Sequence, residues 1–400
     1  MKTNRHRLDK IYLSLISFIS LFGVVILVLV FAYIFNKGTR LLSWNLIVGD
    51  YYPEVYNARS DGVIGENMFV RPENLSESAW FSAKWGIALE DNADFEGKNY
   101  IKVVYIDKNS PLANMPDKND TNHMVGLKKG HSLDKVIFTN NVIVLSREGA
   151  QNAILLFDEA EGIADIIFSK PGNGIRGSLI TTGYLILFTL IIALPLGIFT
   201  AIYLNEFANP GRWYVKWLRR LVETLTGVPS IIYGLFGAAL FIPFISSITS
   251  SEGGNILTGA LTLSVMVLPI VISATEDALK AIPDDFRHAS LALGANRSQT
   301  TFKIVLRAAI PGILSGVLLS IGRIIGESAA LIYAVGTAIK DKIILTEKST
   351  SLSVFIWSVM SGENPNFELA ASVAIIIMIF VLLLNLGIKI ISSKFIFKHN

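Results

Sequence analysis

The sequence contains no cysteine in its 400 residues. Disulfide bonds and cysteine-based metal or redox sites are therefore excluded. No two of its five histidines lie within one helical turn, so none is placed for an HExxH zinc motif. We therefore expect no metal site and no zinc-dependent enzyme.

Charged residues are also scarce, at 17% of the chain, whereas a typical soluble domain has about 25%. The formal net charge is +3, without the basic stripe of a nucleic-acid-binding protein. Hydrophobic residues make up 52% of the sequence, and the mean hydropathy is +0.51. A large part of the surface must therefore face something other than water.

Six apolar runs are long enough to cross a bilayer, which needs about 20 apolar helical residues. They are Ile11–Phe35, Ser178–Tyr203, Thr224–Ile245, Ile256–Thr275, Ala309–Val335 and Phe367–Ile391. The first run is longer than the apolar core of a signal peptide, and no A-x-A-like cleavage site follows it. We interpret it as an uncleaved membrane anchor, with a cleaved signal peptide as the alternative.

Lysine and arginine residues collect in the segments that lie on one side of these spans. They occupy the N-terminus, the loops after the second and fourth spans, and the C-terminal tail. The positive-inside rule places this side, with both termini, in the cytoplasm. The opposite loop 246–255 has no lysine or arginine, although the outer loop 336–366 has three lysines. Residues 36–174 then lie outside the cytoplasm.

Residues 36–174 form a polar segment with the alternating pattern of β-strands. Strands are predicted over Tyr100–Ile106, Val136–Leu145 and Asp165–Phe168, and a helix over Ala150–Ala160. A segment of this length can bury a hydrophobic core of its own. We therefore expect a separate, β-rich domain.

Three short motifs stand in a suggestive order within this segment. They are Trp85–Leu89, Ser110–Ala113 and Gly126–Gly130. With the predicted strands and helix, this order resembles a PDZ domain, which binds extended peptides by adding a strand to a sheet edge. A β-rich insertion without a ligand fits the pattern equally well. The segment would serve either to dock a solute-binding protein or only to fold.

Residues 276–308, between the fourth and fifth spans, carry clear helix signals. A proline ends one helix, two acids suit the first turn of the next, and a glycine suits the left-handed position after its end. These residues are Pro283, Asp284, Asp285 and Gly294. The pattern predicts a short helix over Phe286–Leu293 and a second helix over Ser298–Arg307, which leads back to the membrane.

The fifth span contains two charged residues, Arg323 and Glu327, in an otherwise apolar helix. Each costs about 2.5–3.5 kcal/mol near the bilayer centre, so a function is expected. They are four residues apart and can pair on one face of the helix, and Gly316 and Ser320 lie on the same face. A guanidinium offers donors suited to phosphate-like oxyanions. We predict that Arg323, Glu327, Ser320 and Gly316 line a substrate pathway; the alternative is a structural Arg–Glu pair.

The sequence also lacks a Gly-x-x-x-x-Gly-Lys-Ser/Thr motif. We therefore expect any ATP to be used by another chain, and no cofactor to be bound by this one. No histidine falls in any of the six predicted spans, which argues against an intramembrane protease.

Residues 276–308 resemble the EAA loop, the coupling segment of ABC importer permeases. The loop's motif combines Glu-Ala-Ala, a glycine and Ile-x-Leu-Pro, and it is matched here by His288-Ala289-Ser290, Gly294 and Ile304-Val305-Leu306. His288 replaces the glutamate, and Arg307 replaces the proline. A cytoplasmic amphipathic hairpin without a partner is the alternative.

Three further stretches are similar to phosphate-importer permeases of the PstA type. They are Ala201–Ala208, Thr226–Gly237 and Arg323–Ala329. The resemblance extends over Gly177–Ile391. It implies an all-α polytopic membrane protein with six transmembrane helices and the type I ABC importer permease fold, which carries an inserted extracytoplasmic β-rich domain.

The domain organisation follows from this resemblance. Residues 1–35 form the cytoplasmic N-terminus and first transmembrane helix, 36–174 the extracytoplasmic domain, and 175–400 a permease domain of five helices with the coupling loop 276–308. The residues implied to contact the ATPase are Asp284, Asp285, Phe286, His288, Ala289, Ser290 and Gly294.

The resemblance further implies an importer of inorganic phosphate across the bacterial cytoplasmic membrane by alternating access. Its partners would be a second permease of the PstC type, two ATPase subunits of the PstB type and a phosphate-binding protein of the PstS type. The ATPase subunits would use the ATP, so this chain would not itself be an enzyme. The alternatives are a permease for another oxyanion or small solute, and a membrane-anchored PDZ-like adaptor or protease.

Overall fold

The computed structural model describes residues 2–59, 68–93, 99–118, 123–172, 174–362 and 365–397. The chain forms two compact units. A helical unit consists of Met1–Ile47 and Ile175–Asn400, and a β-rich unit consists of Val48–Gly174. Residues 36–47, which the sequence pattern assigned to the β-rich segment, belong to the helical unit.

Within the described residues, six helices are long and apolar enough to cross a membrane, so the predicted number of spans is confirmed. They are α1 (Lys2–Gly38), α4 (Arg176–Ile202), α6 (Ser230–Ile248), α7 (Ile256–Lys280), α10 (Leu306–Gly326) and α13 (Phe367–Phe397). Shorter helices connect them: α2 (Trp44–Val48), α5 (Trp213–Thr226), α8 (Asp284–Ala292), α9 (Arg297–Thr300), α11 (Ala329–Ala334) and α12 (Leu352–Met360). Two π-helical turns, η4 (Tyr203–Phe207) and η5 (Thr301–Val305), follow α4 and precede α10.

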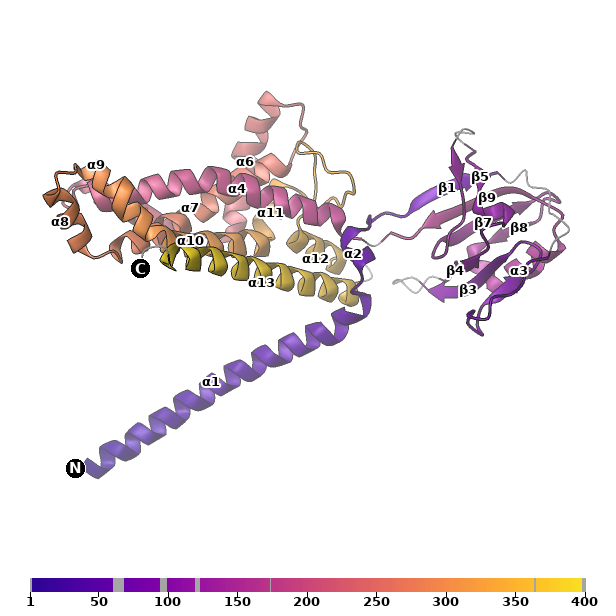
Figure 1. Cartoon of the computed structure of the whole chain (residues 1–400), viewed down its shortest axis with the longest axis horizontal. Helices are drawn as coiled ribbons and strands as arrows, with labels where there is room; N and C mark the ends of the chain where they lie inside the picture. The colour runs from indigo at the N-terminus through magenta and orange to yellow at the C-terminus, as the bar shows by residue number, and fades with distance from the viewer. Residues whose placement is uncertain are drawn as a thin grey trace. The chain divides into compact units, whose positions relative to one another are not determined.

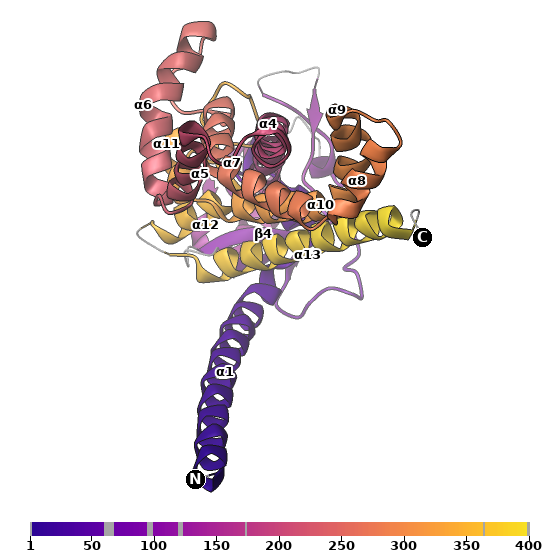
Figure 2. The ribbon, with the colours of Figure 1, turned by 90° about the vertical axis from the view of Figure 1, so that its left-hand side faces the viewer.

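The helix α7 packs against both α4 and α10 and is the most buried of the six spans (Figures 1 and 2). Glycines allow this close packing. A Cβ atom on Gly197 of α4 would lie 2.5 Å from Val271 Cγ1, and one on Gly316 of α10 would lie 2.5 Å from Ala274 Cβ. Small residues at helix contacts are typical of membranes, where association depends on close van der Waals packing.

Two predicted spans have different limits in the structure. The third begins at Ser230 rather than Thr224, because the chain is extended at Pro229, between α5 and α6. The fifth does not continue to Val335: α10 ends at Gly326, and Glu327 has extended backbone angles (φ −80°, ψ 124°). The carboxylate of Glu327 then accepts the Ala330 N–H at 3.1 Å and caps the short helix α11.

The first span, α1, contacts the other helices near its C-terminal end. Ser372 of α13 donates its hydroxyl to the Gly38 carbonyl at 2.7 Å, and a Cβ atom on Gly38 would meet Ala371. Along most of the described length of α1, the apolar side chains from Tyr12 to Phe35 are exposed. Figure 1 shows α1 running away from the helices that pack around α7. An apolar, exposed helix of this length is suited to lipid or to another membrane chain.

The β-rich unit contains an antiparallel sheet in the order β1-β9-β7-β4-β3-β2, with β8 paired to β7. The strands are β1 (Glu54–Ala58), β2 (Trp80–Ser82), β3 (Ile87–Ala93), β4 (Asn99–Ile106), β7 (Ser132–Phe138), β8 (Ile143–Leu145) and β9 (Ile163–Lys170). A small sheet joins β5 (Met115–Pro116) to β6 (Met124–Val125). The single strand predicted over Val136–Leu145 was wrong, because a turn with Asn141 at φ +60° separates β7 from β8.

The helix α3 (Ala150–Glu159) packs on this sheet and helps form the unit's hydrophobic core. Trp85 is fully buried there, and its indole N–H donates to the Phe157 carbonyl at 2.7 Å. The end strand β2 pairs with β3, with Trp80 opposite Leu89. β2 also lies beside α3, where the Ser82 hydroxyl donates to the Asp158 carboxylate. The chain's own strand therefore fills the sheet edge next to α3.

Candidate functional site

The segment between α7 and α10 is a helical hairpin, as the sequence predicts. After Pro283, α8 runs from Asp284 to Ala292, and Gly294 follows it with φ +88°. The Gly294 N–H donates to the Leu291 carbonyl (3.0 Å), and the next N–H donates to the Ser290 carbonyl (3.2 Å). This pair of bonds is a Schellman motif, which requires a left-handed residue at Gly294. The predicted turn residue is confirmed.

The returning arm of the hairpin begins with a capping box. The Asn296 side chain accepts from the Gln299 N–H at 2.8 Å, and the Gln299 side chain accepts from the Asn296 N–H at 3.0 Å. From there α9, η5 and α10 follow one another without a break, so the arm starts at Arg297, one residue before the predicted Ser298. The two arms are joined by a buried bond between the Ser290 and Thr300 hydroxyls, 2.9 Å apart.

Most of α8 is exposed. Within this helix, all of which the structure describes, Arg287 and Ser290 are the two residues shielded from solvent. The apolar side chains of Phe286 and Leu291 face outward together with Asp285, His288 and Ala289. Beyond the helix, Leu293 is 89% exposed. Exposed apolar side chains grouped on one short helix indicate an interaction surface.

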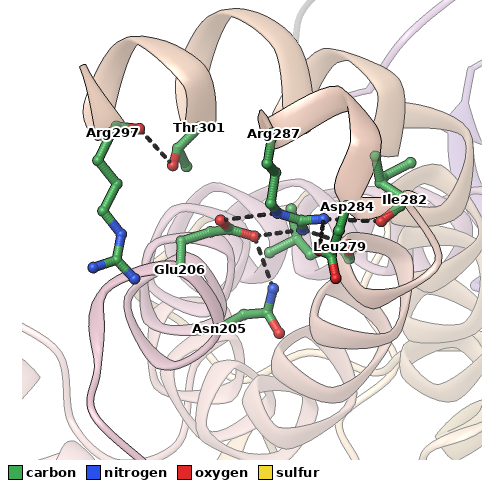
Figure 3. Close-up of polar contacts among 8 residues, drawn as sticks. All are labelled: Asn205, Glu206, Leu279, Ile282, Asp284, Arg287, Arg297 and Thr301. Atoms are coloured by element: carbon green, nitrogen blue, oxygen red, sulfur yellow. Dashed lines mark hydrogen bonds and ion pairs between the residues drawn. The ribbon is translucent and has the colours of Figure 1, made fainter. Parts of the chain in front are cut away.

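Arg287 attaches α8 to the end of α4 (Figure 3). Its Nη2 lies 2.8 Å from Glu206 Oε1, and its Nε lies 3.4 Å from Glu206 Oε2. The same guanidinium donates to the Ile282 carbonyl (2.8 Å), the Leu279 carbonyl (3.0 Å) and Asp284 Oδ1 (3.1 Å). One side chain therefore joins α8 to η4 and to the end of α7.

Both partners in this ion pair are shielded: the side chains are 18% exposed for Arg287 and 8% for Glu206. Hydrogen bonding to Glu206 raises the pKa of Arg287, burial opposes this, and the charges of Glu206 and Asp284 add to the increase. Asn205 donates to Glu206 Oε1 at 2.8 Å and helps to fix the carboxylate. The guanidinium is thus held in one geometry by several charge-assisted hydrogen bonds.

A second contact links η4 to the returning arm. The guanidinium carbon of Arg297 lies 5.5 Å from the centre of the Phe207 ring, within the range of a cation–π interaction. The five-residue turn η4 is therefore in contact with both arms of the hairpin. π-Helical turns are rare and frequently occur at functional sites.

Sequence reasoning missed Glu206 and Arg287 as functional residues. Glu206 lies in the stretch Ala201–Ala208 that carries the family resemblance, and Arg287 lies directly before His288. Their partnership joins positions 81 residues apart, and no local periodicity connects them. A charged residue at the end of an apolar span was the available signal.

In the fifth span the predicted pair is present. Arg323 Nη2 lies 3.4 Å from Glu327 Oε2, and the exposed fractions of the two side chains differ, at 46% and 3%. Gly316 and Ser320 are buried, and the Ser320 hydroxyl donates to the Gly316 carbonyl at 3.0 Å. The structure thus brings Arg323 to Glu327, while Gly316 serves the packing of α10 on α7.

Arg323 borders a cavity of about 610 Å³ between α7, α10 and α13. The lining is mostly apolar, and its polar members include Ser315, Arg323 and Asn385. Such a cavity is large enough for a small anion. Arg323 is the cationic residue among the residues that line it.

Comparison with known proteins identifies the class. Residues 193–396 match the family described as binding-protein-dependent transport system inner membrane component, and the chain belongs to this family. The predicted membership is confirmed, and with six apolar spans the chain is a multi-pass membrane transport component. The β-rich unit Val48–Gly174 lies outside the matched residues.

Several relatives are similar over the same share of the chain. The probable ABC transporter permease protein YqgI of Bacillus subtilis is 33% identical over 234 residues, 54% of this chain and 77% of the relative. The phosphate transport system permease protein PstA of Yersinia pestis is 32% identical over 230 residues, 56% of this chain and 75% of the relative. PstA 1 of Mycobacterium tuberculosis strain H37Rv is 33% identical over 221 residues, 55% and 68% of the two chains. The resemblance to PstA-type permeases is therefore confirmed.

Proposed function

We propose that this chain is a permease subunit of an ATP-driven importer of inorganic phosphate in the bacterial cytoplasmic membrane. The observation that carries the proposal is α8, a short helix between two spans whose apolar side chains are exposed and whose base is fixed by Arg287. Family membership and the PstA-type relatives support the transported solute. Transport follows alternating access, with closure of the ATPase subunits moving the membrane helices.

In this proposal an ATPase subunit docks on α8 and uses the ATP, so this chain is not itself an enzyme. Phe286, Leu291 and Leu293 supply apolar contacts, while Asp284, Asp285, His288 and Ala289 supply the rest of the exposed docking surface. Ser290 attaches the helix to the returning arm through Thr300, and Gly294 ends the helix in a left-handed conformation. The partners are two ATPase subunits, a second permease and an external phosphate-binding protein, of the PstB, PstC and PstS types.

Arg323 is the residue we propose to meet the anion. It is permanently charged, half exposed and on the wall of a cavity. Glu327 holds the guanidinium when the cavity has no anion and competes with a bound one, which favours release. Gly316 acts indirectly, by letting α10 pack closely on α7, and the buried Ser320 hydroxyl bonds to the Gly316 carbonyl within α10.

The absence of native cysteine provides a direct test of docking, because a single introduced cysteine is the sole thiol of this chain. A photo-crosslinker on Leu291→Cys should capture the ATPase subunit in membranes. The same crosslinker on Ile344→Cys, an exposed position in the predicted outer loop, should not. Equal capture from both positions, or none from Leu291→Cys, would contradict the proposal.

Uptake into vesicles tests the solute. Vesicles that hold the complete importer should accumulate phosphate when ATP is inside and the binding protein is outside. An excess of sulfate should not compete. If sulfate abolishes phosphate uptake, or is itself accumulated, the chain serves another oxyanion.

We also propose that the β-rich unit is PDZ-like and extracytoplasmic, with both termini of the chain in the cytoplasm. The sheet covered by α3 supports the PDZ-like fold. The concentration of lysine and arginine in the loops on the opposite side of the membrane supports the topology. A membrane-impermeant maleimide applied to whole cells should label Asn140→Cys, in an exposed turn of this unit, and leave Leu291→Cys unlabelled. The reverse pattern would invert the topology.

A further inference from the structure

Two side-chain attachments join α8 to the rest of the helical unit. Ser290 bonds to Thr300 on the returning arm, while Arg287 bonds to Glu206 on η4 and to two carbonyls at the end of α7. The remaining residues of this fully described helix are exposed. A force on the outer face of α8 must therefore reach the membrane helices through these contacts and through the backbone at its two ends.

We infer that Arg287 and Glu206 form the link that transmits the movement of α8 to α4, so that Arg287 is a positioning residue for coupled transport. The inference rests on the proposed docking of an ATPase subunit at α8. It adds a pathway that the backbone alone does not supply, because α8 is continuous in the chain with α7 and α9 and not with α4. Through Glu206 the movement reaches the end of α4 as well.

The geometry of the link requires arginine. A guanidinium has five N–H donors in a rigid fork. Arg287 meets five acceptor atoms: two oxygens of Glu206, the Leu279 and Ile282 carbonyls and Asp284 Oδ1. A lysine at this position offers three donors on a flexible stem and can satisfy only part of this set. The Leu279 carbonyl, in the last turn of α7, also accepts the Ile282 N–H at 3.3 Å, and the Ile282 carbonyl lies just beyond the end of the helix.

The link is also stiff at its far end. Glu206 lies within η4, and Asn205 holds one of its oxygens. Phe207, the last residue of η4, lies under Arg297 of the returning arm. Both arms of the hairpin thus contact the same five-residue turn, and α8 cannot tilt relative to α4 without disturbing at least one contact.

A neighbouring ion pair provides a matched control. Arg219 of α5 donates to Glu276 of α7 at 2.9 Å and to the Leu204 carbonyl at 2.9 Å. This pair is also part-buried and near the end of α7. Its acceptors, Glu276 in α7 and the Leu204 carbonyl in η4, both lie outside α8. Its loss should loosen the contact of α5 with η4 and α7 while leaving the Arg287–Glu206 bonds between α8 and η4 intact.

The experiment measures phosphate uptake and ATP hydrolysis in vesicles that hold the complete importer, together with capture of the ATPase from Leu291→Cys. Arg287→Ala should lower the number of phosphates imported per ATP by about tenfold, within the range that loss of a coupling contact produces. Capture of the ATPase should persist. Arg287→Lys should be intermediate, and Glu206→Gln, which keeps one of the two acceptor oxygens, should also be intermediate.

Combining Arg287→Ala with Glu206→Ala should be no worse than the more severe single change, because both remove one link. Arg219→Ala should leave the ratio of phosphate to ATP unchanged. An unchanged ratio in Arg287→Ala, or additive losses in the double variant, would overturn the inference. If Arg287→Ala is not inserted in the membrane, Arg287→Lys and Glu206→Gln decide the question with the same ratio. Failure of wild-type docking or uptake would instead refute the proposed function.

Discussion

Gly294 ends α8 with φ +88°, and its effect can be separated from the effect of side-chain size. No atom lies within 4 Å of the place where a Cβ atom on Gly294 would stand, so any side chain has room there. The constraint is the backbone conformation, which costs a residue other than glycine about 1–2 kcal/mol. Asparagine bears this cost better than most residues because it visits the left-handed region more readily.

Gly294→Val should therefore disturb the hairpin, and Gly294→Asn should not. A β-branched residue at this position should cost at least about 2 kcal/mol, enough to change the population of the closed turn by a factor of about 30. The two bonds of the Schellman motif would open, and α8 would lose its fixed end. Both variants add a side chain of comparable size into open space, so they differ chiefly in backbone preference.

Hydrogen exchange across residues 283–300 measures the turn directly, and the ratio of phosphate imported to ATP hydrolysed measures its consequence. We expect faster exchange and a lower ratio in Gly294→Val, with Gly294→Asn close to wild type. Equal impairment of the two variants would show that size matters rather than conformation. A valine variant with wild-type exchange would refute the argument altogether.

Three further outcomes follow from other parts of the molecule. Arg323→Ala should reduce phosphate uptake at least about tenfold, while capture of the ATPase persists. Leu319→Ala, a change on the same cavity wall, should have little effect on uptake measured in the same vesicles. Gly316→Leu should lower the thermal stability of the full chain by at least about 2 kcal/mol, because its side chain would collide with Ala274; a melting experiment in detergent checks this. In the β-rich unit, burial chiefly, and then Lys128 and Lys170, lower the pKa of His131, while Glu54 acts in the opposite direction. The contribution of neutral His131 to the stability of the β-rich unit should therefore be complete above about pH 6.5 and be lost as the pH falls through the lowered pKa. Hydrogen exchange of β7 should show this loss of stability in wild type and not in His131→Phe.

The parts of the fold that local chemistry determines were predictable. Long apolar runs predict the six spans, and the sequence Pro283 to Gly294 predicts α8 and its turn because each signal acts on the adjacent backbone. The break after Gly326 was not predictable from hydropathy. It depends on Glu327, whose carboxylate caps α11 rather than lying along a continuous helix.

The candidate site was predictable in part for the same reason. Arg323 and Glu327 are four residues apart, so their pairing follows from helix geometry. The pairing of Arg287 with Glu206 depends on how α4, α7 and α8 come together, which no local pattern encodes. Gly316 has the spacing of a pathway residue, yet its contact with Ala274 shows that small residues on a polar stripe can also be packing residues.

The short strand β2 affects whether copies of the protein can associate through their β-rich units, which we propose to lie outside the cytoplasm. Open sheet edges invite pairing with other chains, and short edge strands limit this risk. At this end of the sheet the unit presents three residues, Trp80–Ser82, in place of the seven of β3. A dense array of transporters would therefore meet little exposed strand backbone on this flank, and self-association there should be weak.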